Sequence, residues 1–142
     1  MPYLNYASTL WDGCSQFIFK KINSIHRRAI KKLNNNQTLT TDQKLRTLAI
    51  LPLKKQLEFN KLVLIHKIYN EKTPPYLNNI ITKASCRYNS KNLLIPKSKL
   101  DLFKTSLSFS GPTLWNKLPD SMKSTTSLNS FKRKLHNLMI NE

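Results

Sequence analysis

The fold is decided by residues 106–138, SLSFSGPTLWNKLPDSMKSTTSLNSFKRKLHNL, because this stretch holds the clearest local rules in the chain. Apolar and polar side chains alternate from residue 103 to residue 110, which is the period of a half-buried strand. Ser110, Gly111 and Pro112 then supply a cap oxygen, a flexible residue and a ring fixed near helical φ. We therefore expect a strand over 103–109, followed by a short helix that Pro119 ends.

The expected short helix carries Leu114, Trp115 and Leu118 inward. For Trp115, packing in a core is favoured over a role as a platform for base stacking. After a turn over 120–126, Ser127 is the expected N-cap of an amphipathic helix. The apolar residues at helical spacing on one face of that helix are Leu128, Phe131, Leu135, Leu138 and Met139. A strand edge, a tryptophan and a helical stripe thus converge on one small core.

The same stretch carries a family resemblance. FSGPTLWNKLP (109–119), followed by STTSLNSFKRKL (124–135), resembles the C-terminus of the polyprotein of jockey-like non-LTR retrotransposons, or LINE elements, downstream of their reverse transcriptase. Three further segments stand in the order that such a tail would have them: YLNYASTLW (3–11), INSIHRRAIKKL (22–33) and LVLIHKIYNEKTPPYL (62–77). The resemblance covers nearly the whole chain.

This resemblance implies a non-catalytic tail of an RNA-directed DNA polymerase. The Tyr-x-Asp-Asp motif of that polymerase lies upstream of the tail and is absent from this sequence. The partner that the resemblance implies is the upstream reverse transcriptase domain of the parent polyprotein. Because Met1 falls inside the region of resemblance, the chain resembles a truncated copy of such an element.

Charge is the outlying property of the composition. The 142 residues include 24 Lys and Arg against 7 Asp and Glu, which gives a net charge of +17 and a pI near 10.2. Such a field attracts polyanions, so nucleic acid is the first partner to consider and an anionic membrane surface the second. No stretch reaches the ~20 apolar residues of a membrane span, and no signal peptide is seen. We expect an intracellular protein, in the nucleus or the cytoplasm, without a membrane partner.

The predicted fold class is mainly α with a small β-hairpin, in a single small domain or fragment over 1–142. Its parts are a helical half over 2–81, a basic linker with an edge strand over 82–101, and a strand-helix-helix unit over 102–140. Residues 93–95 would form the edge strand of the hairpin and pair with 103–109.

The helical half is expected to contain a short helix over 2–12 and longer ones over 14–33, 40–51 and 52–69. Thr40 and Gln43 fit a capping box. The helix starting at Pro52 is the candidate centre of the domain, because it contains four successive apolar residues. The residues expected to form the buried stripe of the 14–33 helix are Ile18, Ile22, Ile25, Ala29 and Leu33.

The opposite side of the 14–33 helix is the main candidate for binding the backbone of RNA or DNA. A row of cations usually marks a solvated helix face, but such a face mixes signs, and this segment has no acidic residue. Its candidate binding residues are Lys20, Lys21, Arg27, Arg28, Lys31 and Lys32. A second candidate surface, which brackets the expected hairpin, consists of Lys83, Arg87, Lys91, Lys97, Lys99 and Lys104. Lys97 and Lys99 are the members of it that we assign to nucleic-acid binding.

Enzyme chemistry is not expected. The seven acidic residues are single and widely spaced, whereas two-metal polymerases and nucleases need clustered carboxylates. His26 and His66 are expected to be structural, and Cys14 and Cys86 to be free thiols outside any zinc spacing. We predict no catalytic residue, no metal, no cofactor and no small-molecule substrate. The alternative function is a stand-alone protein–protein interaction module with no nucleic-acid role.

Overall fold

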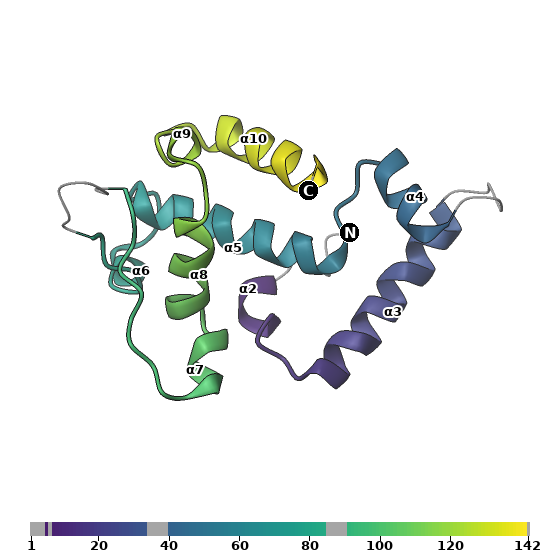
Figure 1. Cartoon of the computed structure of the whole chain (residues 1–142), viewed down its shortest axis with the longest axis horizontal. Coiled ribbons are helices and arrows are strands. Elements are labelled where there is room, and N and C mark those ends of the chain that lie inside the picture. The colour runs from purple at the N-terminus through teal and green to yellow at the C-terminus, as the bar shows by residue number, and fades with distance from the viewer. Residues whose placement is uncertain (1–4, 6, 34–39, 85–90, 142) are drawn as a thin grey trace.

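A computed structural model describes residues 5, 7–33, 40–84 and 91–141, and helices dominate it (Figure 1). In chain order the helices are α2 (Ser8–Trp11), α3 (Gln16–Leu33), α4 (Thr41–Thr47), α5 (Leu53–Tyr69), α6 (Pro75–Asn78), α7 (Asp101–Thr105), α8 (Leu107–Asn116), α9 (Asp120–Lys123) and α10 (Leu128–Asn141). The expectation of a mainly helical chain is confirmed. The described residues contain no β-sheet, so the predicted β-hairpin is wrong for this part of the chain.

Helix α5 is the central element, as the sequence predicted. It begins directly after Pro52, whose fixed φ and missing N–H suit the entry of a helix. Residues 62–65 are four successive apolar residues, which point to all sides of the helix. If only one side of α5 were covered, some of these apolar side chains would stay in water. Helix α8 crosses α5 on one side and α10 runs along another, and these are its most extensive contacts (Figure 1).

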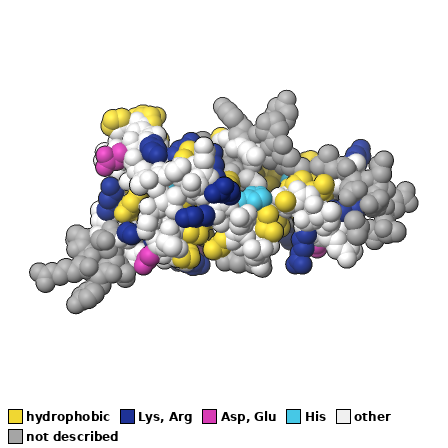
Figure 2. Space-filling view, turned by 90° about the horizontal axis from the view of Figure 1, so that it is seen from above, with side chains coloured by type: hydrophobic (Ala, Val, Ile, Leu, Met, Phe, Trp, Pro, Cys, Tyr) yellow, Lys and Arg dark blue, Asp and Glu magenta, His cyan; other side chains and the backbone are white. Residues whose placement is uncertain are grey.

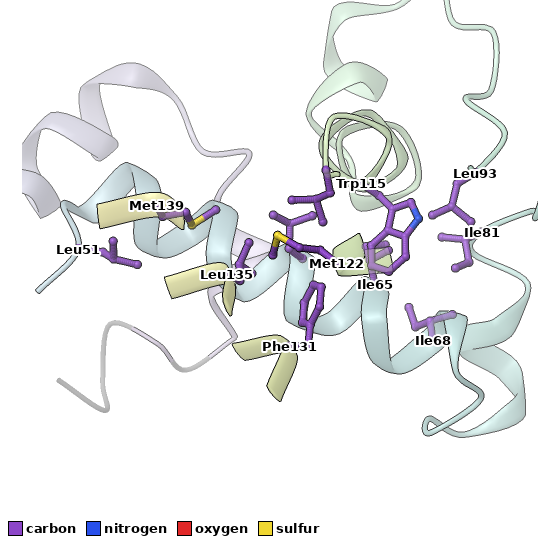
Figure 3. Packing of buried hydrophobic residues seen from close by; sticks show 12 residues of the cluster. Leu51, Ile65, Ile68, Ile81, Leu93, Trp115, Met122, Phe131, Leu135 and Met139 are labelled. Carbon is purple, nitrogen blue, oxygen red and sulfur yellow. The ribbon is translucent and has the colours of Figure 1, made fainter. Parts of the chain in front are cut away.

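The core lies where these three helices meet. Trp115 of α8 and Phe131 of α10 are both 0% exposed, and their ring centroids are 6.0 Å apart. Figure 3 shows both rings beside Ile65 of α5, with Leu93 on the far side of the indole. The indole Nε1 donates a hydrogen bond of 2.9 Å to the carbonyl oxygen of Lys91. Trp115 is therefore a core residue with a satisfied polar atom, and its ring is closed to a base.

Residues 103–105 and 107–109 are helical, which contradicts the predicted strand. Helix α7 ends at Thr105 and α8 begins at Leu107, two residues later. The alternation is too short to exclude a helix. Leu107, Gly111 and Trp115 are spaced by four residues, so they share one face of α8, and that face packs against α5. The hydroxyl of Ser110 has a local partner, because its Oγ donates a hydrogen bond of 2.7 Å to the carbonyl oxygen of Ser106.

Pro112 lies inside α8, so the predicted helix start at residues 110–112 is also wrong. A proline there removes one helical hydrogen bond, to the carbonyl of Ser108. Gly111 explains why the helix still packs tightly. A Cβ added at Gly111 would lie 2.7 Å from Cδ1 of Ile65, so only glycine lets α8 approach α5 this closely.

The predicted edge strand pairs with a different segment. Leu93 forms an isolated antiparallel bridge with Lys83. The predicted partner, 103–109, is taken up by α7 and the start of α8. The two backbone hydrogen bonds beside the bridge run from Ala84 N–H to Asn92 O (2.9 Å) and from Leu94 N–H to Thr82 O (2.8 Å). Residues 85–90, which include Cys86 and Arg87, lie outside the described part of the chain.

Helix α3 forms where it was predicted but is turned about its axis. Ile18 and Ile25 of the expected buried stripe are 48% and 62% exposed, whereas His26 and Ile30 are 4% and 0% exposed. Ile22 and Ala29 are half-buried. The helix packs mainly against α4, which lies on the side of His26 and Ile30. The predicted buried face of α3 is therefore wrong: the buried face is the one with His26 and Ile30, and part of the predicted stripe faces solvent.

Helix α4 begins as predicted and ends earlier. Gln43 N–H donates 3.4 Å to Thr40 Oγ1, and Thr40 N–H donates 2.9 Å to Gln43 Oε1, which completes the predicted capping box. The helix ends at Thr47 instead of near residue 51. Ala49 there has a φ of 50°, a left-handed conformation that turns the chain towards α5.

Helix α2 is tied to the centre of the molecule by a buried ion pair. The ammonium group of Lys61 on α5 is bonded to the Asp12 carboxylate at the end of α2. It also donates 2.8 Å to Ser110 Oγ on α8, and Lys61 is only 5% exposed. This lysine therefore connects three helices and is a structural residue.

Candidate nucleic-acid interface

Helix α3 presents the predicted basic face to solvent. All six candidate side chains on it, Lys20, Lys21, Arg27, Arg28, Lys31 and Lys32, are exposed. The helix has no acidic residue, and Lys31 and Lys32 lie in its last turn, where the negative end of the helix dipole stabilises cations. Lys44 of α4 lies within 3.5 Å of the Lys31 carbonyl oxygen and holds α4 against this end.

Four of the six cations line one open groove of about 370 Å³. We call it the α3 groove; its lining residues are Lys20, Asn23, Ser24, Arg27, Arg28, Lys31 and Thr41. The lining contains only cations and neutral hydrogen-bonding side chains. Phosphate oxygens in protein–nucleic acid complexes take their hydrogen bonds from side chains of these kinds. From Lys20 to Lys31 the helix rises about 16 Å, so the groove can follow a stretch of backbone.

Among the described residues, only one carboxylate pairs with a cation of the groove. Asp42 of α4 lies 3.6 Å from Arg27, but both side chains are largely exposed and Asp42 is not part of the groove lining. Such exposed pairs are weak and leave the cation free to bind an anion. The other ion pairs of the described residues involve carboxylates on other elements, namely Asp12, Glu71, Asp101 and Asp120. Figure 2 shows the same imbalance on the face seen from above, where blue side chains are common and magenta ones isolated.

Two candidates, Lys21 and Lys32, lie beside the groove. Both belong to the same exposed side of α3. The ammonium of Lys21 lies 4.3 Å from the ring centroid of Phe17, which is a cation–π contact. They can add to the positive potential of the groove without lining it.

The second predicted surface, of which Arg87 lies outside the described residues, stays a prediction. Lys97 and Lys99 are exposed, but the segment that carries them lies at the opposite end of the molecule from α3 (Figure 1). Three other members of that set have structural partners. Lys83 pairs with Glu71 at 3.5 Å, Lys91 donates 2.7 Å to Ser124 Oγ, and Lys104 pairs with Asp101 at 2.7 Å.

The buried histidines lie in the core and the α3–α4 contact. His66 is 0% exposed, stacks on Phe131 with centroids 4.2 Å apart, and has its Nε2 2.6 Å from the carbonyl oxygen of Thr125. Burial lowers the pKa of His66; the Thr125 hydrogen bond raises it and the charge of Lys72 lowers it further. Burial also lowers the pKa of His26. Both imidazoles are therefore stabilised in the neutral form.

No metal cluster is present among the residues that the structure describes. In that part of the chain, no three His, Cys, Asp or Glu side chains come together. Cys14 is a free thiol there. Nor does any helix in the described ranges combine the length and apolar character needed to cross a bilayer.

The sequence analysis did not predict the neutral residues of the groove, Asn23, Ser24 and Thr41, or the nearby ring of Phe17. Asn23 and Ser24 lie one turn after Lys20 and one turn before Arg27, so a helical projection could have found them. Phe17 lies one turn before Lys20 and was detectable in the same way. Thr41 could not be found, because only the packing of α4 on α3 brings it to the groove.

Comparisons of the chain with protein-family models, with curated proteins and with solved structures found no match.

Proposed function

We propose that this protein is a non-catalytic module that binds the sugar-phosphate backbone of RNA or DNA without strong sequence preference. The observation that carries the proposal is the α3 groove, in which Lys20, Arg27, Arg28 and Lys31 lie together on a helix without an acidic residue. Contacts of this kind are electrostatic and independent of sequence, since every nucleotide carries the same phosphate. The groove offers no apolar cavity for a small molecule.

The origin that fits this function is the one implied by the resemblance in the sequence. We propose that the chain derives from the C-terminal tail of a jockey-like retrotransposon polyprotein. There the α3 groove would hold template RNA or target DNA for the upstream reverse transcriptase domain. The genomic sequence directly upstream tests this origin: an in-frame or decayed polymerase with Tyr-x-Asp-Asp supports it, and unrelated coding sequence contradicts it.

The second candidate function is a protein–protein interaction module. One observation favours it: Leu94 and Leu100, on the segment before α7, and Leu102, in the first turn of α7, are 57%, 72% and 82% exposed. Exposed apolar side chains gathered in one segment often mark a docking surface. If the chain binds no nucleic acid but binds a protein partner through this segment, the second function is supported over the first.

The test of the first function is a comparison of two triple variants with the same charge change. The first replaces Arg27, Arg28 and Lys31 with Gln. The matched control replaces Lys117, at the end of α8, and Arg133 and Lys134 of α10, which are exposed cations outside α3. Binding of a labelled RNA and a labelled DNA is measured over a range of salt concentrations, and thermal melting shows that each variant is folded.

We expect the first variant to lower the slope of log affinity against log salt by about 2 to 3 units, since each lost phosphate contact removes about 0.7 to 0.9. The control should change it by less. A third variant, Lys97→Gln with Lys99→Gln, asks whether the distant segment contributes. Equal losses in the first variant and the control would leave only a diffuse polycation and contradict the proposed interface.

A further inference from the structure

An exposed aromatic ring lies within the basic face of α3. Phe17 is 66% exposed, although a phenylalanine of a globular domain is usually buried. It precedes Lys20 by three residues and Lys21 by four, so it shares their side of the helix. On a helical projection Phe17 falls between Ser24 and Arg28 of the groove. Its position therefore continues the α3 groove beyond Lys20.

The ring of Phe17 contacts Lys21 on one face and is otherwise accessible to a ligand. The Lys21 ammonium lies over the ring at 4.3 Å from its centroid, which accounts for one face. The exposure of 66% leaves much of the rest of the ring in water.

Duplex and single strand would use such a face differently. A row of cations binds the phosphates of either form. The bases of a duplex are stacked on each other and cannot reach a ring on the protein surface. Unpaired bases can reach such a ring. Proteins that bind single strands combine a basic groove with aromatic side chains on which the bases stack. A ring next to a row of cations thus favours the unpaired form.

We propose that the α3 groove binds single-stranded RNA or DNA in preference to duplex, with one base stacked on Phe17. This inference rests on the proposed function and names its ligand class. The phosphates on one side of the stacked base lie along Lys20, Arg27 and Lys31. The base that stacks is not selected by sequence, because every nucleobase has a π-face.

The test uses three labelled probes of equal phosphate number: a single-stranded oligonucleotide, a duplex, and a strand of abasic sites. Phe17→Leu keeps an apolar side chain of similar size but removes the ring, and Phe17→Tyr keeps the ring. Phe103→Leu is the matched control, since Phe103 is exposed by 39% and belongs to a different helix, α7. Circular dichroism shows that each variant is folded.

Phe17→Leu should weaken single-strand binding by about 5- to 150-fold, the range measured for the loss of one stacked base, and leave duplex and abasic binding unchanged. Phe17→Tyr and Phe103→Leu should retain single-strand binding. Equal weakening on all three probes, or no weakening on the single strand, would overturn the inference. So would Phe17-dependent binding to vesicles of anionic lipid without any effect on the oligonucleotide.

The outcome also separates this inference from the proposed function. If the triple variant at Arg27, Arg28 and Lys31 loses affinity for every probe while Phe17→Leu loses none, the backbone interface stands and the single-strand inference fails. If the triple variant binds every probe like the wild type, the α3 groove is not the interface and both fail.

Discussion

The side-chain amide of Asn116 hydrogen-bonds to both backbone polar groups of Leu93. Its Oδ1 accepts from Leu93 N–H at 2.9 Å, and its Nδ2 donates to Leu93 O at 2.9 Å. The amide thus acts as a neighbouring strand would, and it docks the 91–94 segment on the end of α8. Trp115, the preceding residue, is bonded to Lys91 O. The dipeptide Trp115-Asn116 therefore fixes the segment that the sequence had assigned to a hairpin.

Asn116→Leu should destabilise the protein by about 1 to 3 kcal/mol. Leucine has a similar shape but leaves the N–H and C=O of Leu93 without their partners, and Leu93 is 2% exposed. Urea unfolding measures the free energy. Asn129→Leu, at an exposed position of α10, is the control and should have little effect. A similar small effect in Asn116→Leu would show that these hydrogen bonds do not hold the segment.

Gly111→Ala should destabilise by about 1 to 3 kcal/mol, although alanine favours helix elsewhere. The added Cβ would meet Cδ1 of Ile65 at 2.7 Å, and Ile65 is 0% exposed, so it has little room to move. Ile65→Val removes that Cδ1. The double variant should therefore lose less than the sum of the two single losses, and strict additivity in urea unfolding would contradict a direct clash.

Asp12→Asn should cost about 2 to 4 kcal/mol, because it leaves the ammonium of Lys61 buried without its counter-charge. Adding Lys61→Met should recover part of the loss, since the unpaired charge is then gone. Glu71→Gln is the matched control: its pair with Lys83 is 74% and 52% exposed and should contribute less than about 1 kcal/mol. If both carboxylate variants unfold at the same denaturant concentration, the Asp12 pair has no structural role.

Stability should fall as the pH drops below about 6.5, the ordinary pKa of histidine. The folded pKa of His66 and of His26 is lowered, so the unfolded chain takes up protons first. The stabilisation is complete above pH 6.5 and is lost as the pH falls towards the folded pKa values. Proton uptake would also give His66 a second N–H, and within the described residues its buried Nδ1 has no partner.

This dependence is measured by urea unfolding over a series of pH values. His66→Gln keeps a donor for the Thr125 carbonyl and cannot titrate, so it should flatten the dependence. His26→Gln in addition should flatten it further. A double variant with the same dependence as the wild type would assign the acid sensitivity to other groups.

The amino-acid sequence by itself determined those elements whose signals are local. Pro52 sets the start of α5, and four successive apolar residues make α5 the helix that others cover. Thr40 and Gln43 complete their capping box within four residues of chain. The spacing of Phe131 and Leu135 gives α10 its buried face. The cations of α3 were also readable, because an exposed polar face needs no partner to be recognised.

Only the tertiary structure decided which surface of an element is covered. Helix α3 has two sides that could be buried, and α4 covers His26 and Ile30 while Ile25 stays in water. Residues 103–109 alternate like a strand, yet α8 already begins at Leu107. The helix is favoured because Gly111 lets one face of α8 pack closely against Ile65 of α5. The groove follows the same rule, since Thr41 joins it only through packing. Burial is a property of pairs of elements, and no single segment encodes its own partner.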